Sequence, residues 1–303
     1  MKEDAIQFGA SKTLVGVVTD PADDGGSRPA VILLNSGIIH RVGPNRLYVT
    51  LARRLARAGF VTLRFDLSGV GDSVIRRDNV PFERSSVQET QEAMEYLAAT
   101  RGVDRFLLAG ICTGAVVAYH TARADARVLG AILINGQGYI PETEEAIHAY
   151  LASRQRRRYY LGRALYNLGS WRKLATGRVG YRDILGTLGF RRQGRRSTKD
   201  LPNSKAGEVA AGIRSLADQG REMLFLYSAG DPGIEELDLI LEGKIAELSA
   251  RETVQYRIVE KADHMFTALA SQEEFLRSTV DWLQDVAAKS LLGRAGKGRK
   301  TPT

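Results

Sequence analysis

The sequence predicts an α/β protein in which a mostly parallel sheet is covered by helices on both faces. Two observations support this class. Short apolar runs bounded by turn residues, which are typical of buried strands, alternate with longer segments of helical periodicity. The alternation continues to about residue 136, stops, and resumes at about residue 205. This interruption indicates that a segment without strands is inserted into one α/β core.

The predicted elements follow this alternation in order. Strands are expected at residues 5–8, 13–19, 29–34, 60–65, 105–109, 128–135, 222–228 and 253–259. Helices are expected at residues 44–59, 86–100, 112–124, 206–219, 234–248 and 271–288. Pro44 suits a first helical position, and Ser86-x-x-Glu89 and Ser271-x-x-Glu274 have the spacing of capping boxes, which mark helix starts.

Length and charge distribution divide the chain into three parts. The 303 residues carry a formal net charge of +8. Residues 151–200 contain fourteen Lys or Arg against two Asp, and residues 289–303 contain five Lys or Arg and no acidic residue. The basic character is therefore local. We predict a core formed by residues 1–136 and 205–288, a helical basic cap at residues 137–204, and a disordered basic tail at residues 289–303.

The cysteine content and the lengths of the apolar runs indicate the subcellular location. Cys112 is the only cysteine, which excludes an internal disulfide framework and fits a reducing compartment. The first residues lack the apolar region of a secretory signal. No apolar run approaches the ~20 residues that a membrane-spanning helix requires. We therefore expect a cytoplasmic protein.

The sequence around Cys112 has the layout of a nucleophile elbow. An apolar strand ends near Gly110, and a helical segment begins after Cys112. A nucleophile on such a sharp turn needs small neighbours two residues to either side, and Gly110 and Gly114 meet this need. The Thr113 amide then lies at a helix start, where it is able to stabilise an oxyanion. The alternative is a buried structural cysteine.

Five motifs occur in a characteristic order: Asn35-Ser36-Gly37, Asp66 with Gly69-x-Gly71-x-Ser73, Gly110-x-Cys112-x-Gly114, Gly230-Asp231 and Asp263-His264. Through this order the core resembles the α/β-hydrolase superfamily, in particular serine aminopeptidase-like hydrolases and the hydrolases encoded alongside exosortase systems. The resemblance implies the α/β-hydrolase fold with an inserted helical cap. The chain departs from most of that superfamily at Cys112, where serine is usual. Dienelactone hydrolases and polyhydroxyalkanoate synthases also have cysteine there.

The nucleophile requires a base, and the base requires an orienting carboxylate. His264 follows the last strand at the carboxyl edge of the sheet, where open α/β sheets place their sites, and is the predicted base. Asp231 is the predicted orienting acid because the order nucleophile, acid, histidine is that of this fold. Three alternatives remain open: Asp231 as a helix N-cap, Asp263 as the orienting acid, and His40 as the base.

Further residues are expected around the nucleophile. The backbone amides of Thr113 and Ile38 are the predicted oxyanion donors, because the loop that contains Ile38 faces the elbow in this fold. Ser36 and His40 are expected in the pocket. His120 lies eight residues beyond the nucleophile on the same helix, roughly 12 Å along its axis, which is too far for proton transfer.

A cysteine nucleophile favours thioester chemistry. A thiol beside an imidazole can form a thiolate–imidazolium pair, and attack on a thioester exchanges one thioester for another. We therefore predict a Cys-His-Asp acyl enzyme, either a thioesterase or an acyltransferase, without a cofactor or a metal. One alternative is an ordinary carboxylic-ester or amide hydrolase. A second is a non-catalytic scaffold that serves as a binding module through the basic cap.

The basic cap mixes arginines with aromatic residues. The positions singled out as docking candidates are Arg156, Arg157, Arg158, Tyr159 and Trp171. Guanidinium groups in such a segment suit an acidic acyl carrier protein or the phosphates of a coenzyme A thioester. Contact of cap or tail with an anionic membrane surface and a purely solvated helix face remain as alternatives. Nucleic acid is not expected as the partner, because the catalytic residues would then be idle.

Overall fold

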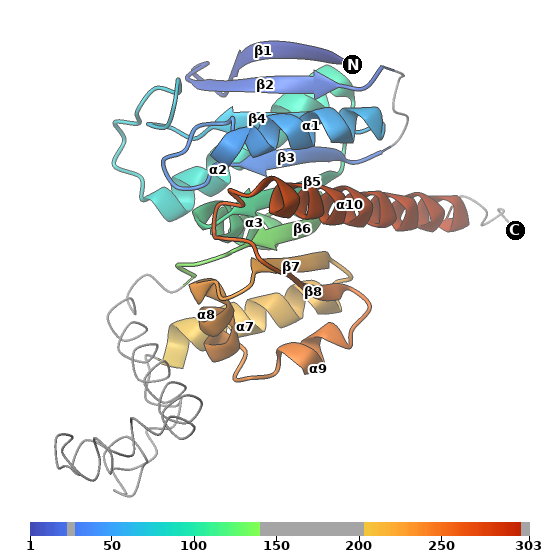
Figure 1. Ribbon diagram of the computed structural model, residues 1–303. Helices are drawn as coiled ribbons and strands as arrows, with labels where there is room; N and C mark the ends of the chain where they lie inside the picture. Colours follow the sequence, from blue (N-terminus) through green and yellow to red (C-terminus); the bar gives the residue numbers. More distant parts are fainter. Residues whose placement is uncertain (23–27, 140–202, 298–303) are drawn as a thin grey trace, which may run out of the picture. The chain divides into compact units, whose positions relative to one another are not determined.

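A computed structural model describes residues 1–22, 28–139 and 203–297. Its centre is an eight-stranded sheet with the order β1-β2-β4-β3-β5-β6-β7-β8 (Figure 1). The strands are β1 (Lys2–Phe8), β2 (Leu14–Asp20), β3 (Ala30–Leu34), β4 (Thr62–Asp66), β5 (Phe106–Ile111), β6 (Val128–Ile134), β7 (Glu222–Ser228) and β8 (Val254–Val259). β1 pairs antiparallel with β2, and β2 pairs antiparallel with β4. The remaining pairs, which join β4, β3, β5, β6, β7 and β8 in that order, are all parallel. The predicted fold class is confirmed.

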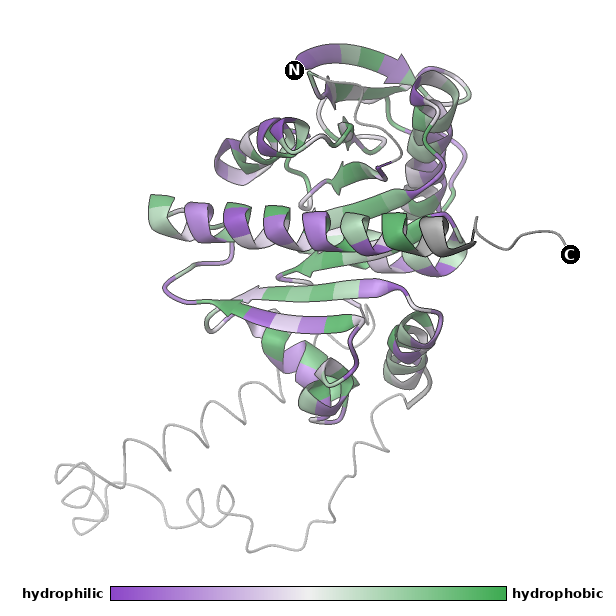
Figure 2. Cartoon of the chain, turned by 90° about the vertical axis from the view of Figure 1, so that its right-hand side faces the viewer, coloured by the Kyte–Doolittle hydropathy of each residue, from purple (hydrophilic) through white to green (hydrophobic). Residues whose placement is uncertain are grey.

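Helices flank both faces of the sheet (Figures 1 and 2). The described helices are η1 (Pro44–Arg46), α1 (Leu47–Arg57), α2 (Phe82–Arg101), α3 (Thr113–Ala124), α7 (Asn203–Asp218), α8 (Pro232–Ile240), α9 (Ile245–Ser249) and α10 (Leu269–Lys297). α1 and α10 share one hydrophobic cluster with alternate residues of the central strands, such as Leu107 and Ala109 of β5. α3 packs on β5 and β6 and also against α2, which together cover the other face.

The central strands are apolar because both of their faces are covered. All five residues of β3 are buried, and so are all six of β5. In a parallel sheet covered on both sides, neither face can be polar, which gives continuous apolar runs instead of alternation. Because β3, β4, β5, β6, β7 and β8 are parallel, their carboxyl ends lie at one edge of the sheet. The connecting loops with polar residues extend from this edge.

The chain divides into two compact units, Met1–Tyr139 with Ala210–Thr303, and Ile140–Val209. The boundary lies three residues later than the residue 137 expected from the sequence. Gly138 and Tyr139 donate their backbone amides to the Glu236 carboxylate of α8, both at 2.9 Å. The predicted cap otherwise falls largely on residues 140–202, outside the described part of the chain.

Both predicted capping boxes are wrong. α2 begins at Phe82, directly after Pro81, so that Ser86 and Glu89 lie inside the helix. Glu89 instead accepts the Ser68 amide at 2.9 Å and pairs with a guanidinium, because it is turned inward and buried. The second box fails similarly, since α10 begins two residues before Ser271.

Two helix boundaries also differ from the prediction. The helix expected at residues 234–248 is split into α8 and α9, because Glu242 and Gly243 have positive φ angles of 54° and 76°. α10 continues to Lys297, through residues expected to be disordered from 289 onward. Within this extension, Lys289 forms an ion pair with Glu222 of β7 at 2.8 Å. Residues 298–303 lie outside the described part.

Candidate active site

Cys112 occupies the corner between β5, which ends at Ile111, and α3, which begins at Thr113. Its backbone has φ 58° and ψ −119°, a conformation that non-glycine residues rarely adopt. Such strain costs about 1–3 kcal/mol and persists only where the surrounding structure enforces it. The turn therefore holds the Cys112 side chain at the carboxyl edge of the sheet.

The two glycines that flank Cys112 enforce this turn through close backbone contacts. A Cβ atom on Gly114 would lie 2.6 Å from the Asn35 carbonyl oxygen, and one on Gly110 would overlap the Gly114 backbone. Any larger residue at either position would therefore push α3 away from β3 and β5. This steric need is the one that the spacing of the glycines indicates.

The buried Tyr48 joins the two strands that precede and neighbour the elbow. The Tyr48 hydroxyl on α1 donates to the Leu34 carbonyl at 2.9 Å and accepts the Ile111 amide at 3.0 Å. It thereby joins the ends of β3 and β5, immediately before the corner. Burial raises the pKa of Tyr48, so the hydroxyl stays protonated and its donor role is fixed.

The structure brings His264, Asp231 and Cys112 together from three separate loops. The His264 Nδ1 atom lies 2.6 Å from the Asp231 Oδ2 atom. The pKa of His264 is raised to about 10, mainly by its hydrogen bond to Asp231 and secondly by the Cys112 side chain, although burial opposes the shift. The imidazole is thus biased toward its protonated form at neutral pH.

Asp231 has two roles. It is the N-cap of α8, where its Oδ1 atom accepts the Gly233 amide at 2.9 Å, and its Oδ2 atom faces His264. The N-cap and the orienting acid, which the sequence left as alternatives, are therefore both realised in one carboxylate. Its side chain is fully buried in the ion pair with His264.

The neighbouring Asp263 does not orient the imidazole. Its Oδ1 atom accepts the amides of Met265 at 2.9 Å and Thr267 at 3.1 Å, so it folds the loop locally. The Asn135 side chain donates to the His264 carbonyl at 2.8 Å and fixes this loop to the end of β6. The His264 ring is therefore held by its backbone as well as by Asp231.

The two predicted oxyanion donors lie on segments that are joined by a hydrogen bond. The Thr113 hydroxyl accepts the Gly37 amide at 2.8 Å, which ties the loop after β3 to the start of α3. Among the described residues, the structure shows no hydrogen-bond acceptor for the backbone amides of Ile38 and Thr113. Both amides are therefore available at the edge of the elbow.

This arrangement can be compared with known proteins. The Alpha/beta hydrolase family matches residues 31–277. The chain belongs to the alpha/beta hydrolase family. The match covers the elbow, Asp231 and His264, and it supports the general reading of the chain as a hydrolase. No curated protein matches the chain.

Three solved structures share the fold. An esterase from Pyrococcus furiosus has a TM-score of 0.58 at 15% identity, covering 94% of this chain and 91% of its own. A proline iminopeptidase from Mycobacterium smegmatis has a TM-score of 0.56 at 17% identity, with 95% and 100% covered. An alpha/beta hydrolase from a Penicillium species has a TM-score of 0.58 at 17% identity, with 95% and 100% covered. At these identities the likeness concerns the fold.

In this alpha/beta hydrolase, the loop after β4 is organised by Asp66. This fully buried carboxylate accepts the Arg41 amide at 2.5 Å and the Asp72 amide at 3.2 Å, and pairs with the Arg41 guanidinium. Of the predicted pocket residues, Ser36 is buried and forms a bridge with Ile39. His40 has an exposed side chain. His264, the histidine that faces Asp231, stays the predicted base.

His120 lies on α3, away from the predicted catalytic group. Its ring packs edge-on against Tyr119 with 5.0 Å between the ring centres, and burial lowers its pKa. It is therefore a partly buried packing residue of α3. The predicted docking residues Arg156, Arg157, Arg158, Tyr159 and Trp171 lie outside the described residues.

Sequence reasoning missed two polar side chains near the predicted catalytic residues. Gln137 donates to the Asp231 Oδ1 atom at 3.0 Å, and Tyr48 bridges the strands under the elbow. Gln137 follows the end of β6 by three residues, and polar residues just past a parallel strand are one available signal. Tyr48 offers no such signal, because it lies among the apolar residues of a helix.

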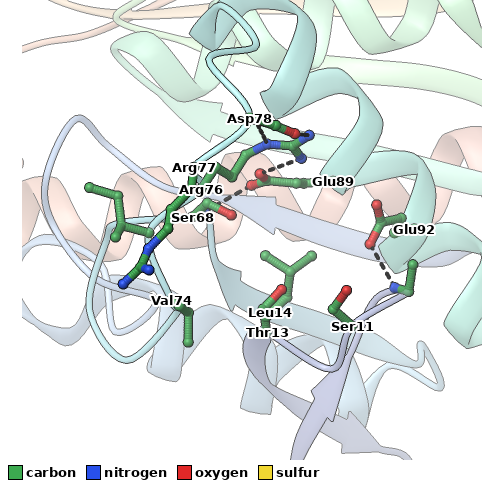
Figure 3. Close-up of a pocket in the computed structure, with 12 residues that line it drawn as sticks. Ser11, Thr13, Leu14, Ser68, Val74, Arg76, Arg77, Asp78, Glu89 and Glu92 are labelled. Carbon is green, nitrogen blue, oxygen red and sulfur yellow. Dashed lines mark hydrogen bonds and ion pairs between the residues drawn. The ribbon is translucent and has the colours of Figure 1, made fainter.

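A cavity of about 450 Å³ lies elsewhere on the same edge of the sheet. Figure 3 shows its lining, which comes from the β1–β2 turn, the loop after β4, and α2. Arg76 crosses it and pairs with Asp78 and Glu89. None of Cys112, Asp231 and His264 lines it. We therefore assign the predicted chemistry to the elbow rather than to this cavity.

Within residues 1–22, 28–139 and 203–297, no group of three or more His, Cys, Asp or Glu side chains is arranged to hold a metal ion. No helix in the same part of the chain combines the length and the apolar character that crossing a membrane requires.

Proposed function

We propose that this alpha/beta hydrolase is a Cys-His-Asp acyl enzyme that cleaves or transfers an acyl group from a thioester or an ester. The observation that supports it is the pairing of His264 with Asp231 at 2.6 Å, beside the Cys112 side chain, which contributes to the raised pKa of His264. A nucleophile, a base and an orienting carboxylate in this arrangement are the parts that nucleophilic catalysis requires.

In the proposed mechanism, the Cys112 sulfur attacks the carbonyl carbon of the donor, and a C–S bond forms. The carbonyl oxygen becomes an oxyanion, which the Thr113 and Ile38 amides stabilise. Protonated His264 then donates its proton to the leaving thiolate or alkoxide as the bond from carbon to the leaving group breaks. The product of this half-reaction is an acyl-thioester on Cys112.

In the second half-reaction, neutral His264 takes a proton from the acceptor, which is water, an alcohol, an amine or a thiol. The acceptor attacks the acyl carbon, and Cys112 leaves as the thiolate. Because a thioester remains activated, the acyl-Cys112 intermediate suits transfer as well as hydrolysis. Asp231 keeps the imidazole in one tautomer throughout and stabilises its charge.

Mass spectrometry after incubation with acyl-thioesters tests this proposal. We expect an acyl adduct on Cys112 that is lost in Cys112→Ala. No adduct with any acyl donor, at short or long times, would instead support the non-catalytic binding scaffold. Product analysis with added amine or alcohol acceptors then separates transfer from hydrolysis.

A second candidate function is that of an ordinary carboxylic-ester or amide hydrolase. Two proteins of similar fold, an esterase and a proline iminopeptidase, favour it. Cys112→Ser separates the two candidates. We expect this variant to keep part of the ester hydrolysis and to lose acyl transfer, because an oxygen ester is less activated than a thioester. Equal transfer by both proteins would remove the argument from thiol chemistry.

We further propose that the donor is presented on an acidic acyl carrier protein or as a coenzyme A thioester. The support is the concentration of fourteen Lys or Arg within residues 151–200. Guanidinium groups bind carboxylates and phosphates in bidentate fashion, so they favour an anionic carrier over a neutral donor. The single cysteine indicates a reducing compartment, and we propose that this compartment is the cytoplasm. Carrier-bound and coenzyme A-linked donors occur there.

A further inference from the structure

The side chain of Gln137 reaches the pair formed by Asp231 and His264. Its Nε2 atom lies 3.0 Å from Asp231 Oδ1 and 3.2 Å from His264 Nδ1. No other described side-chain amide makes both contacts. Gln137 comes from the segment that leaves β6, so a third loop contributes to the acid–base pair besides those of β7 and β8.

The hydrogen-bond pattern fixes which way the Gln137 amide is turned. The ionised Asp231 carboxylate only accepts, so the NH2 group and not the carbonyl oxygen must face its Oδ1 atom. His264 Nδ1 lies 2.6 Å from the other carboxylate oxygen and donates its proton there. The contact with Gln137 is therefore not a second hydrogen bond to the ring, and Nε2 of His264 is the nitrogen that exchanges a proton with Cys112.

The backbone next to Gln137 is anchored to the helix that Asp231 begins. Gly138 and Tyr139 each donate an amide to one oxygen of Glu236, both at 2.9 Å. Glu236 is 5% exposed and lies on α8, whose N-cap is Asp231. The backbone after Gln137 and the Asp231 carboxylate are thus both attached to α8, which limits the freedom of the contact.

We propose that Gln137 is a positioning residue, which holds Asp231 with one oxygen turned to His264 and so maintains the orientation of the imidazole. The inference rests on the proposed function of the Cys112, His264 and Asp231 group. It adds a residue outside that group. Gly233 also donates to Asp231 Oδ1, but its amide is fixed by the helix start. Among the described residues, only the Gln137 side chain restrains the carboxylate from the side of β6.

Removal of the amide donor is the first test. We expect Gln137→Leu to slow acylation of Cys112 by about 10-fold at saturating donor, with little change in KM, because the donor-binding residues are untouched. The matched control is Gln219→Leu, at an exposed glutamine whose amide bonds only to a hydroxyl one helical turn away. Equal acylation rates of Gln137→Leu and wild type would overturn the proposal.

Exchange of the amide and the carboxylate is the second test. Asp231→Asn alone is expected to lower acylation by about 10³–10⁴-fold, because the imidazole loses its acceptor. Adding Gln137→Glu places a carboxylate where the amide now lies close to His264 Nδ1, with the asparagine amide as its partner. We expect the double variant to recover at least about 10-fold of the lost rate. No recovery would contradict the placement of residue 137 beside the Nδ1 atom, on which the proposal rests.

Titration of the His264 ring by NMR separates this inference from the proposed function. The ring signal is assigned by its loss in His264→Gln. We expect the pKa of His264 to fall in Asp231→Asn and to rise again when Gln137→Glu is added, whether or not any acyl donor reacts. A pKa that does not rise in the double variant would overturn the positioning role. Absence of acylation in wild type, with the pKa recovered, would overturn only the proposed function.

Discussion

At the scale of single residues, the proposed chemistry depends on where each hydrogen bond is directed. Thr113 illustrates this, because its amide is a predicted oxyanion donor while its hydroxyl accepts the Gly37 amide at 2.8 Å. The second contact holds the loop with Ile38 against the elbow. One residue therefore carries a predicted donor and also anchors the loop that carries the other predicted donor.

Thr113→Val tests this double role. Valine has nearly the same shape and keeps the backbone amide, but it lacks the acceptor for Gly37. We expect kcat for acylation to fall by about 10-fold or more with KM nearly unchanged, because the oxyanion forms only in the transition state. Steady-state kinetics with one acyl-thioester measures the effect. Thr113→Ser retains the hydroxyl and should stay within about threefold of wild type; an equal loss in both variants would argue against the hydrogen bond.

The raised pKa of His264 predicts a pH-dependent contribution to stability. The folded value of about 10 lies above the ordinary value of 6.5, so folding favours the protonated ring. The contribution is therefore complete below about pH 6.5 and is lost as pH rises through about 10. Urea unfolding of wild type and His264→Gln between pH 6 and 10 should show a stability difference that shrinks with rising pH. A stability difference between the two proteins that grows with pH would contradict the raised pKa of His264.

At the scale of elements, the strained turn is supported by packing between α1, β3, β5 and α3. α3 approaches β3 so closely that only glycine fits at residue 114. From the other face of the sheet, Tyr48 of α1 joins the ends of β3 and β5. The turn at Cys112 is therefore held from both faces of the sheet.

Tyr48→Phe removes only the hydroxyl. We expect the free energy of unfolding to fall by about 1–3 kcal/mol, because the Ile111 amide and the Leu34 carbonyl lose a buried partner. Denaturant unfolding provides the measurement. Tyr256→Phe is the control, at a half-buried tyrosine of β8, and should change stability by less. A Tyr48→Phe protein as stable as wild type would show that the bridge does not support the turn.

At the scale of the whole molecule, charge is distributed unevenly. Residues 151–200 and 289–303 hold nineteen of the 43 Lys and Arg residues. Surface charge of one sign mainly changes the rate and selectivity of association with a charged partner. The choice of donor is therefore expected to depend on these segments, and the bond-forming chemistry on the core.

Reversal of charge in this region tests the docking proposal. We expect Arg156→Glu, Arg157→Glu and Arg158→Glu together to lower kcat/KM for a carrier-bound donor by about 10-fold or more at low salt, and less at high salt, because screening weakens the attraction. A small uncharged thioester should react as before. Arg57→Glu, Arg84→Glu and Arg214→Glu together, at exposed positions of the core, change the net charge equally and serve as the control. Equal kinetics with the carrier-bound donor in both triple variants would contradict the proposal.

Much of the core could be predicted from the sequence because its information is local. Apolar runs mark buried strands, and Gly110 and Gly114 mark a turn that larger residues cannot form. Helix starts are harder to predict. The Ser86 and Glu89 pair has the spacing of a capping box, but Pro81 starts α2 earlier, and Glu89 binds Ser68 in a distant loop. A spacing rule cannot report such a competing long-range partner.

By itself the sequence determined the α/β class, the order of elements, the place of Cys112 at a corner and the polar residues that follow each strand. Only the tertiary structure decided which of those polar residues meet. His264 pairs with Asp231, 33 residues away in the chain, and not with the adjacent Asp263. Gln137 joins them from β6 because β6 lies beside β7 in the sheet. Side-chain partners at the sheet edge depend on strand order and loop direction, which local sequence patterns do not encode.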